Sequence, residues 1–361
     1  MRVIDADAHV EESTATWEHI EPEFYERRPV PLELPQDTSW GEHNAVWFID
    51  YKARKFAASP TLMRRAHRRD VKIPSQELTD VSARLADLDK YGIEKQVIYP
   101  STWLGCLAED LDLEKALTRS YNTYMATQCN QSGGRLHYVA VIPFRDPAAA
   151  AEEIRRVKSL GSAVALFVRG MEWDLPITHP MFRPIYEEAQ AQDLVMGLHI
   201  GFGSPTINRM FEGMPRVKPD PFPHIHPLSR NLLSGLLVQY AFGGLIASAV
   251  LQDFPRLRWV ILETGCEWLV PAIRAHNQRT GKDASSYFRE GQISVSCEPF
   301  EDLAHVAACL GDDCFVVASD MPHGDDFSHD RVEEAFRERG DLSEPVLEKI
   351  LWRNASRLYG I

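Results

Sequence analysis

The chain lacks the features of a secreted, membrane-spanning or nucleic-acid-binding protein. Its six cysteines are scattered without CxxC spacing, so neither a zinc knuckle nor a disulfide framework is indicated. No apolar run reaches roughly 18 residues, and the N-terminus has no signal-peptide pattern. The formal net charge is -13 and no clustered basic face is apparent, which argues against nucleic acid. These absences predict a soluble protein of the reducing cytoplasm without membrane or nucleic-acid partners.

What the chain does contain is an alternation of short apolar runs and amphipathic helical patterns, which is typical of a parallel α/β sheet. We predict one α/β domain over residues 1–361, with the strand number of a closed (β/α)8 TIM barrel. The strands are expected at residues 3–6, 95–99, 136–141, 163–167, 195–199, 259–262, 293–296 and 315–318. Helices are expected at residues 79–91, 113–131, 147–159, 180–192, 229–253, 267–279, 301–309 and 330–339, with a further helix pair over 345–359.

Two segments interrupt this alternation, residues 17–75 after the first strand and residues 201–228 after the fifth. Long irregular loops inside a compact domain are usually lids or binding loops. Both segments follow strands, and in a TIM barrel that is the side of the active site. We therefore expect the two insertions to form a lid. Their tryptophans and phenylalanines also favour a homodimer contact.

The first strand runs into Asp5-Ala6-Asp7-Ala8-His9, and it carries the strongest chemical signal. Alternate residues of a strand point to the same side, so Asp5, Asp7 and His9 should share one face. Carboxylate oxygens and imidazole nitrogens suit zinc, manganese or iron(II).

The ends of later strands carry residues that could join Asp7 and His9. His199 ends the fifth strand, Glu263 follows the sixth, and Asp320 and His323 follow the eighth. Each residue alone is a weak signal, because a single histidine or carboxylate after a strand is often structural. Together they would meet at the mouth of a barrel.

These segments resemble the amidohydrolase-related family of the amidohydrolase superfamily, which includes aminocarboxymuconate-semialdehyde decarboxylase and aromatic acid decarboxylases. The similar segments are IDADAHVEE, GLHIG, FPRLRWVILETGCEWLVP, SDMPHGD and NASRLYGI, and the resemblance extends over essentially the whole chain. It implies a distorted (β/α)8 barrel with one divalent metal, of which zinc is favoured over manganese and iron. By motif position it implies four metal ligands: Asp7, His9, His199 and Asp320.

The chain departs from the family pattern at two positions. Many relatives have His or Glu where Asp7 stands, and decarboxylases often have a catalytic His where Glu263 stands. Glu263 remains a candidate proton shuttle if burial raises its pKa, and Asp320 and His323 are the other candidate catalytic residues. The alternative for Glu263 is a structural carboxylate bonded to loop amides.

Three further residues are candidate substrate contacts. Arg169, at the end of the fourth strand, could bind a substrate carboxylate or form an ion pair at the barrel mouth. His224 and His226 lie in a proline-rich loop and are interpreted as substrate-facing lid residues. The fourth strand has no lysine that could be carbamylated to bridge two metals, which favours a single-metal site.

The sequence therefore predicts a mononuclear divalent-metal enzyme, with decarboxylation of a small carboxylated substrate as the leading reaction. The alternatives are a metal-dependent hydrolase of an amide or ester and a non-catalytic ligand-binding barrel. The presence of a competent residue at all four ligand positions argues against the last of these.

Overall fold

The computed structural model describes residues 1–33, 45–54, 70–207, 227–323 and 329–361. Its centre is an eight-stranded parallel sheet with the order β1-β5-β6-β7-β10-β11-β12-β13. The strands are β1 (Ile4–Val10), β5 (Lys95–Pro100), β6 (Leu136–Ala140), β7 (Ala163–Arg169), β10 (Val195–His199), β11 (Trp259–Ile261), β12 (Ile293–Ser296) and β13 (Phe315–Val316). The last strand returns to the first, where Ala6 N donates to Val317 O at 2.9 Å. The predicted TIM barrel is confirmed.

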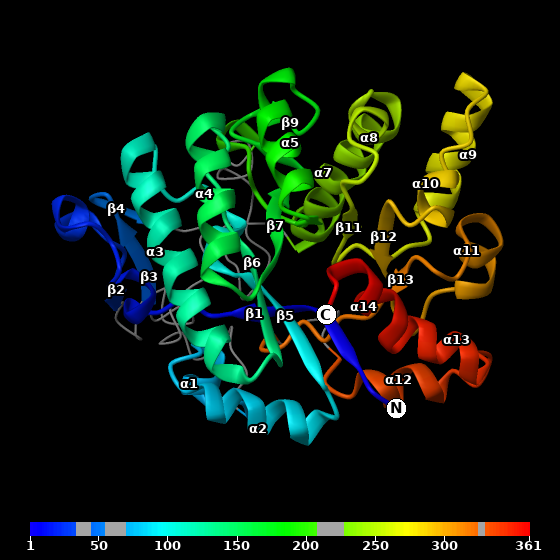
Figure 1. Ribbon diagram of the computed structural model, residues 1–361, viewed down its shortest axis with the longest axis horizontal. Coiled ribbons are helices and arrows are strands. Elements are labelled where there is room, and N and C mark those ends of the chain that lie inside the picture. The colour runs from blue at the N-terminus through cyan, green and yellow to red at the C-terminus, as the bar shows by residue number, and fades with distance from the viewer. Residues whose placement is uncertain (34–44, 55–69, 208–226, 324–328) are drawn as a thin grey trace.

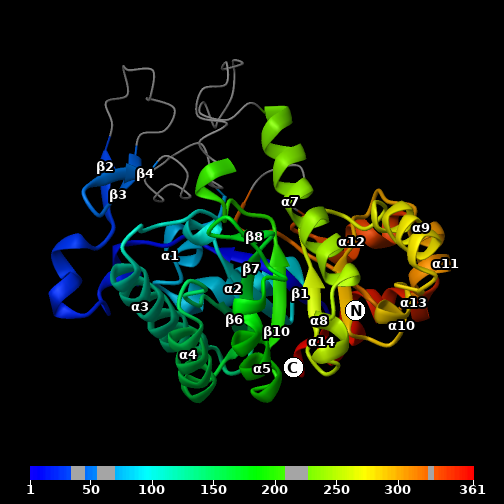
Figure 2. The same cartoon turned by 90° about the horizontal axis from the view of Figure 1, so that it is seen from above.

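Helices surround this barrel, with α3, α4 and α5 side by side on one flank and α10, α11 and α13 on the opposite one (Figures 1 and 2). Their bounds are α1 (Ile73–Gln76), α2 (Val81–Tyr91), α3 (Leu111–Cys129), α4 (Pro147–Leu160), α5 (Arg183–Ala191), α7 (Pro227–Ala247), α8 (Val250–Asp253), α9 (Leu269–Thr280), α10 (Ser286–Arg289), α11 (Leu303–Leu310), α12 (Val332–Glu338), α13 (Glu344–Glu348) and α14 (Asn354–Tyr359). No described helix is both long and apolar enough to span a bilayer.

Two predicted helical segments differ in detail. The segment 229–253 divides into α7 and α8, because the Ser248 hydroxyl accepts a hydrogen bond from Val250 N at 3.3 Å and so competes with the helical pattern. The predicted C-terminal pair is one continuous run, in which a π turn over Lys349–Arg353 joins α13 to α14. The sequence has no glycine or proline between residues 346 and 359 to interrupt it.

Helix α2 lies where the sequence predicts a helix and buries an apolar stripe, and Gly92 ends it in the left-handed conformation with φ 74°. Val81, Leu88 and Tyr91 are buried. Arg84 is buried as well and fully shielded from solvent, although the apolar pattern gives no hint of a charged residue on the inner face.

The first insertion builds a small antiparallel sheet from β2 (Val30–Glu33), β3 (Ala45–Ile49) and β4 (Lys52–Arg54). Arg27 pairs with Asp50 beside this sheet and with Asp110, the N-cap of α3. The described part of the insertion therefore docks beside the segment that follows β5, where the strand ends. Residues 64–69 of this insertion, four of which are arginines, and His224 and His226 of the second insertion lie outside the described residues.

Candidate metal centre and active site

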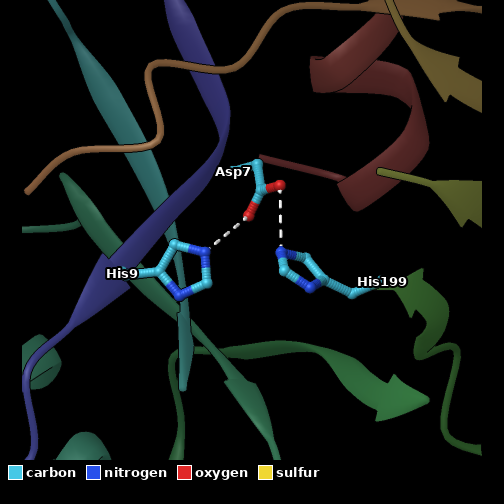
Figure 3. Close-up of side chains that lie close together, drawn as sticks. All are labelled: Asp7, His9 and His199. Atoms are coloured by element: carbon cyan, nitrogen blue, oxygen red, sulfur yellow. Dashed lines mark ion pairs between the residues drawn. The ribbon is translucent and has the colours of Figure 1, made fainter. Parts of the chain in front are cut away.

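Two alternate residues of β1 and the last residue of β10 converge inside the barrel mouth (Figure 3). Asp7 lies between the histidines, with Oδ1 3.7 Å from His9 Nε2 and Oδ2 3.3 Å from His199 Nε2. All three side chains are buried, and one donor atom from each lies within 4.8 Å of the others. That spacing allows one cation to contact all three residues.

Asp5 does not join this group, although strict strand alternation predicts that it shares their face. Its Oδ2 accepts from Gln96 Nε2 at 2.7 Å, and its Oδ1 accepts from Ser319 N at 2.8 Å. The reason is local: the pairing of β1 with β5 shifts register between Asp5 and Ala8, so the period of two is broken there.

The two histidines are oriented as metal ligands would be. The Nδ1 atoms face backbone carbonyls, His9 Nδ1 with Pro100 O at 3.2 Å and His199 Nδ1 with Ile200 O at 2.9 Å. A carbonyl only accepts, so each Nδ1 carries the proton and each Nε2 presents its lone pair to the cluster. Within the described residues, these Nε2 atoms and both Asp7 oxygens are buried without a hydrogen-bond partner. Buried polar atoms in that state are costly, and a divalent cation would satisfy all of them.

Burial and mutual charge set the protonation of this group. Burial lowers the pKa of His9 well below its usual value, and the nearby His323 and His199 add to the effect. Burial raises the pKa of Asp7, while His199 opposes that shift. Burial also acts to lower the pKa of His199, but the Asp7 carboxylate outweighs it and the net shift is upward. His9 is thus neutral near neutral pH, which is the form that binds a metal.

Asp320 and His323 extend the cluster on the side of His9. Asp320 Oδ1 lies 3.4 Å from His9 Nε2 and 2.8 Å from His323 Nδ1. The His323 ring stacks on that of His9 with centroids 4.1 Å apart, and its Nε2 lies 3.1 Å from Ser101 Oγ and 3.4 Å from Glu11 Oε1. Asp320 is therefore placed to contact a cation and to exchange a proton with His323.

Glu263 extends the cluster on the side of His199, with Oε2 3.2 Å from His199 Nε2. Both Glu263 and Asp320 have left-handed backbones, with φ of 57° and 55°. For residues other than glycine this conformation costs on the order of 1 kcal/mol or more. Seven other described residues besides glycine share this conformation, so it does not by itself mark a functional side chain, but at Glu263 and Asp320 it sets the position of a carboxylate beside a histidine of the cluster.

Glu301, which follows β12, is a buried carboxylate bonded to loop amides. Its Oε1 accepts from Cys266 N at 2.6 Å and from Glu267 N at 3.0 Å, and its Oε2 accepts from Glu298 N at 2.8 Å. Sequence reasoning did not identify Glu301. The related sequence feature is the glycine at position 265, because its φ is 63° and an added Cβ would lie 2.5 Å from Glu301 Oε1.

Arg169 forms the second of its two predicted arrangements, the ion pair at the barrel mouth. Its guanidinium pairs with both oxygens of Glu172 in the short hairpin β8 (Met171–Glu172) and β9 (Leu175–Pro176), and Nη1 donates to Gly105 O at 2.8 Å. Sequence reasoning missed Glu172, three residues further along the chain. The pair joins the loop after β7 to the loop after β5.

Tyr99 on β5 is a second residue that sequence reasoning missed. Its ring stacks on the His199 imidazole, with centroids 5.1 Å apart and 24° between the planes. Space for its hydroxyl comes from Gly197, where an added Cβ would lie 2.4 Å from that oxygen. Gly197, the first glycine of the GLHIG segment, thus leaves room for the Tyr99 ring that packs against His199.

Glu12, which sequence reasoning also missed, is buried two residues after the end of β1, the strand that carries Asp7 and His9. Its Oε2 accepts from Thr102 N at 2.7 Å, whereas its Oε1 is buried without a hydrogen-bond partner in the described part of the chain. Burial raises the pKa of Glu12 from 4.5 to about 8. An uncharged carboxylic acid is thus the form that suits this position at neutral pH.

Glu12→Gln is expected to remove a pH-dependent loss of stability. A carboxyl group whose pKa is higher in the folded than in the unfolded chain destabilises the fold as pH rises from its unfolded pKa, about 4.5, to its folded pKa, about 8. In that window the wild type should lose roughly 1.4 kcal/mol per pH unit relative to the variant. Urea denaturation of both chelator-treated proteins between about pH 5 and 8 measures this difference. Parallel stability curves would contradict it.

An eight-stranded parallel barrel with buried nitrogen and oxygen donors at its strand ends defines the class of (β/α)8 metalloenzymes. The chain matches the model of the amidohydrolase family over residues 107–361 and belongs to that family. The predicted family is confirmed, and the chain is an enzyme of the amidohydrolase superfamily.

Several known proteins resemble the whole chain or most of it. A γ-resorcylate decarboxylase from Rhodococcus jostii (strain RHA1) is 25% identical over 311 residues, which cover 80% of this chain and 92% of that protein. The crystal structure of an amidohydrolase from Mycobacterium avium subsp. paratuberculosis K-10 has a TM-score of 0.79 at 20% identity and covers 100% of this chain and 98% of its own. A 5-carboxyvanillate decarboxylase from Novosphingobium aromaticivorans DSM 12444, with bound manganese, has a TM-score of 0.69 at 16% identity and covers 99% and 97%.

Proposed function

We propose that this protein is a mononuclear metal-dependent decarboxylase of a small carboxylated substrate. The observation that carries the proposal is the group of ligand atoms on Asp7, His9 and His199, which are buried without hydrogen-bond partners in the described chain and have one carboxylate beside each histidine. The relatives named as decarboxylases support the reaction, and the manganese bound in one of them supports a divalent cation.

We propose that Asp7, His9, His199 and Asp320 hold the cation. Two imidazoles and two carboxylates are a donor set that suits zinc first, with manganese and iron(II) as alternatives. When bound, the cation would polarise a substrate oxygen and stabilise the negative charge that develops during the reaction.

The flanking carboxylates supply the proton chemistry. When the bond between the substrate carbon and its carboxylate breaks, its electron pair stays on that carbon, carbon dioxide leaves, and the carbon takes up a proton. Glu263 and Asp320 are the candidate donors, and the 2.8 Å contact with His323 Nδ1 gives Asp320 a route for replacing its proton.

The runner-up function is hydrolysis of an amide or ester. It is supported by a carboxylate at position 263, beside His199, because a carboxylate can take the proton of an attacking water. The two reactions differ in their products, which makes them directly separable.

The test is to incubate the metal-loaded protein with γ-resorcylate and 5-carboxyvanillate, and separately with their amides and methyl esters. Decarboxylation predicts one equivalent of carbon dioxide and, in D2O, one deuterium on the vacated carbon. Ammonia or methanol without carbon dioxide would establish the hydrolase instead. A protein that binds metal but converts none of these compounds would contradict both assignments for this substrate class.

We also propose that residues 17–75 and 201–228 form a substrate lid, with His224 and His226 contacting the substrate and Arg169 bordering its space through Glu172. The ion pair of Arg27 with Asp110 supports a lid on this side of the barrel, because it holds the first insertion beside the segment that follows β5.

A cytoplasmic homodimer is proposed, supported by the apolar side chains Leu236 and Tyr240 that α7 exposes one turn apart. Sedimentation velocity would test the dimer, and limited proteolysis with and without substrate would test the lid.

A further inference from the structure

Three buried polar side chains form a hydrogen-bonded network that connects α2, β5 and β1. It begins at Arg84 of α2, whose Nε donates to Gln96 Oε1 at 2.8 Å. The other end of the same amide, Gln96 Nε2, donates to Asp5 Oδ2 at 2.7 Å. All three side chains are fully buried, and within the described residues Arg84 makes no ion pair within 4.0 Å. A buried cation and a buried anion are thus linked through one glutamine.

Both ends of this network of side chains contact the seam at which the barrel closes, where β1 lies against the residues that follow β13. Arg84 Nη2 donates to two backbone carbonyls, His9 O and Met321 O, at 3.1 Å each. Asp5 accepts from the backbone N–H and the hydroxyl of Ser319. These contacts join the first and last barrel segments at two levels, one at His9 and Met321 and the other at Asp5 and Ser319, the residue before Asp320.

The seam itself carries three of the four proposed ligands. Asp320 N donates to Asp7 O at 2.9 Å, and His9 N donates to Met321 O at 2.7 Å. These two backbone bonds, together with that from Ala6 N to Val317 O, set how far Asp320 stands from Asp7 and His9. A slip of this seam would change the separation of the ligand atoms, whereas His199 on β10 would stay where it is.

We propose that Arg84, Gln96 and Asp5 are positioning residues that fix the seam in the register the metal centre requires. This inference rests on the proposed metal centre. Gln96 is chemically specific for the role, because its amide must accept from a guanidinium and donate to a carboxylate at the same time. A carboxylate at position 96 could not donate in its ionised form, and an ammonium could not accept. Either charged group would pair with one of the two buried charges and repel the other, so only the neutral amide satisfies both ends.

The test replaces Gln96 by leucine, which keeps a similar volume and removes both hydrogen bonds. Cobalt(II) is added to the chelator-treated wild type and to Gln96→Leu, and the Kd is measured by chelator competition together with the d–d absorption spectrum. The positioning role predicts a Kd raised about 10-fold or more and a changed spectrum, as is typical when groups that orient metal ligands are lost.

Asn354→Leu is the matched control. Asn354 is also a buried amide, and its Nδ2 donates to Asp312 O and Phe315 O, so it binds β13 at the end remote from the ligands. This variant should lose thermal stability but keep the wild-type Kd and spectrum. A general weakening of the barrel would instead shift the Kd equally in both variants, and that result would overturn the proposal.

Three further outcomes decide the remaining cases. A wild-type Kd and spectrum in Gln96→Leu, with only a lowered Tm, would show a merely structural role and overturn the positioning proposal alone. If Gln96→Leu does not fold, Ser319→Ala is used instead: it removes the hydroxyl bond to Asp5 and the bond that Met321 N donates to the same hydroxyl, both at the seam. This variant must still weaken cobalt binding, or the proposal fails. A wild type that binds no cobalt would overturn the metal centre and this inference together.

Discussion

His199→Ala should yield a folded protein whose metal affinity is lower by about two orders of magnitude or more. The substitution removes a neutral nitrogen donor from the centre of the cluster, since His199 Nε2 lies 3.3 Å from Asp7 Oδ2 and 3.2 Å from Glu263 Oε2. The other proposed ligands, Asp7, His9 and Asp320, supply only one imidazole nitrogen, and carboxylates hold zinc less well than imidazole does. Metal content after dialysis, measured by elemental analysis, is the direct readout.

His137→Ala is the matched control for that experiment. His137 lies on the barrel strand β6 and contacts Gly134 O rather than the cluster, so its loss should leave the metal content unchanged. A His199→Ala protein that keeps the wild-type metal content would remove His199 from the ligand set and with it the centre as assigned.

Glu263→Gln is expected to retain metal and fold but to lose about a hundredfold or more in turnover, the usual effect of removing a general acid or base. Glutamine keeps the size of the side chain and the hydrogen bond between the backbone N–H of residue 263 and Ser296 Oγ, yet it cannot transfer a proton. The measurement is kcat for carbon dioxide release, on the substrate found in the product assay, together with metal content.

Glu267→Gln separates this effect from a change of surface charge. Glu267 lies four residues further along, and its Oε1 accepts from Asp302 N away from the cluster. It should turn over as the wild type does. If Glu263→Gln also does so, Asp320 with His323 becomes the proton carrier. If Glu263→Gln loses its metal, Glu263 acts as a ligand rather than as an acid or base.

The barrel could be predicted because its signals are local. Each strand is a short apolar run, each helix has its own periodicity, and eight repeats of that order favour closure. Asp7, His9 and His199 could be predicted for the same reason, since each sits at the end of a predicted strand and the fold then brings them together.

Other parts of the site depend on contacts that no local pattern records. Arg84 lies 237 residues from Met321, which it bonds, and nothing in the stripe of α2 predicts a buried cation there. The departure of Asp5 from the face of Asp7 follows from a register shift between two strands, which the sequence of one strand does not encode. Glu301 and Glu172 owe their roles to partners that become neighbours only in the folded chain.

The seam also has a consequence for how the protein is made. The bond between Asp5 and Ser319 spans 314 residues, so the two halves of the ligand set meet only after nearly all of the intervening chain has left the ribosome. Joining such distant segments carries the entropic cost of a very long loop, and contacts of this kind form late in folding. A nascent chain would therefore offer at most a partial and weak site, and the cation would be acquired by the finished barrel rather than guide its folding.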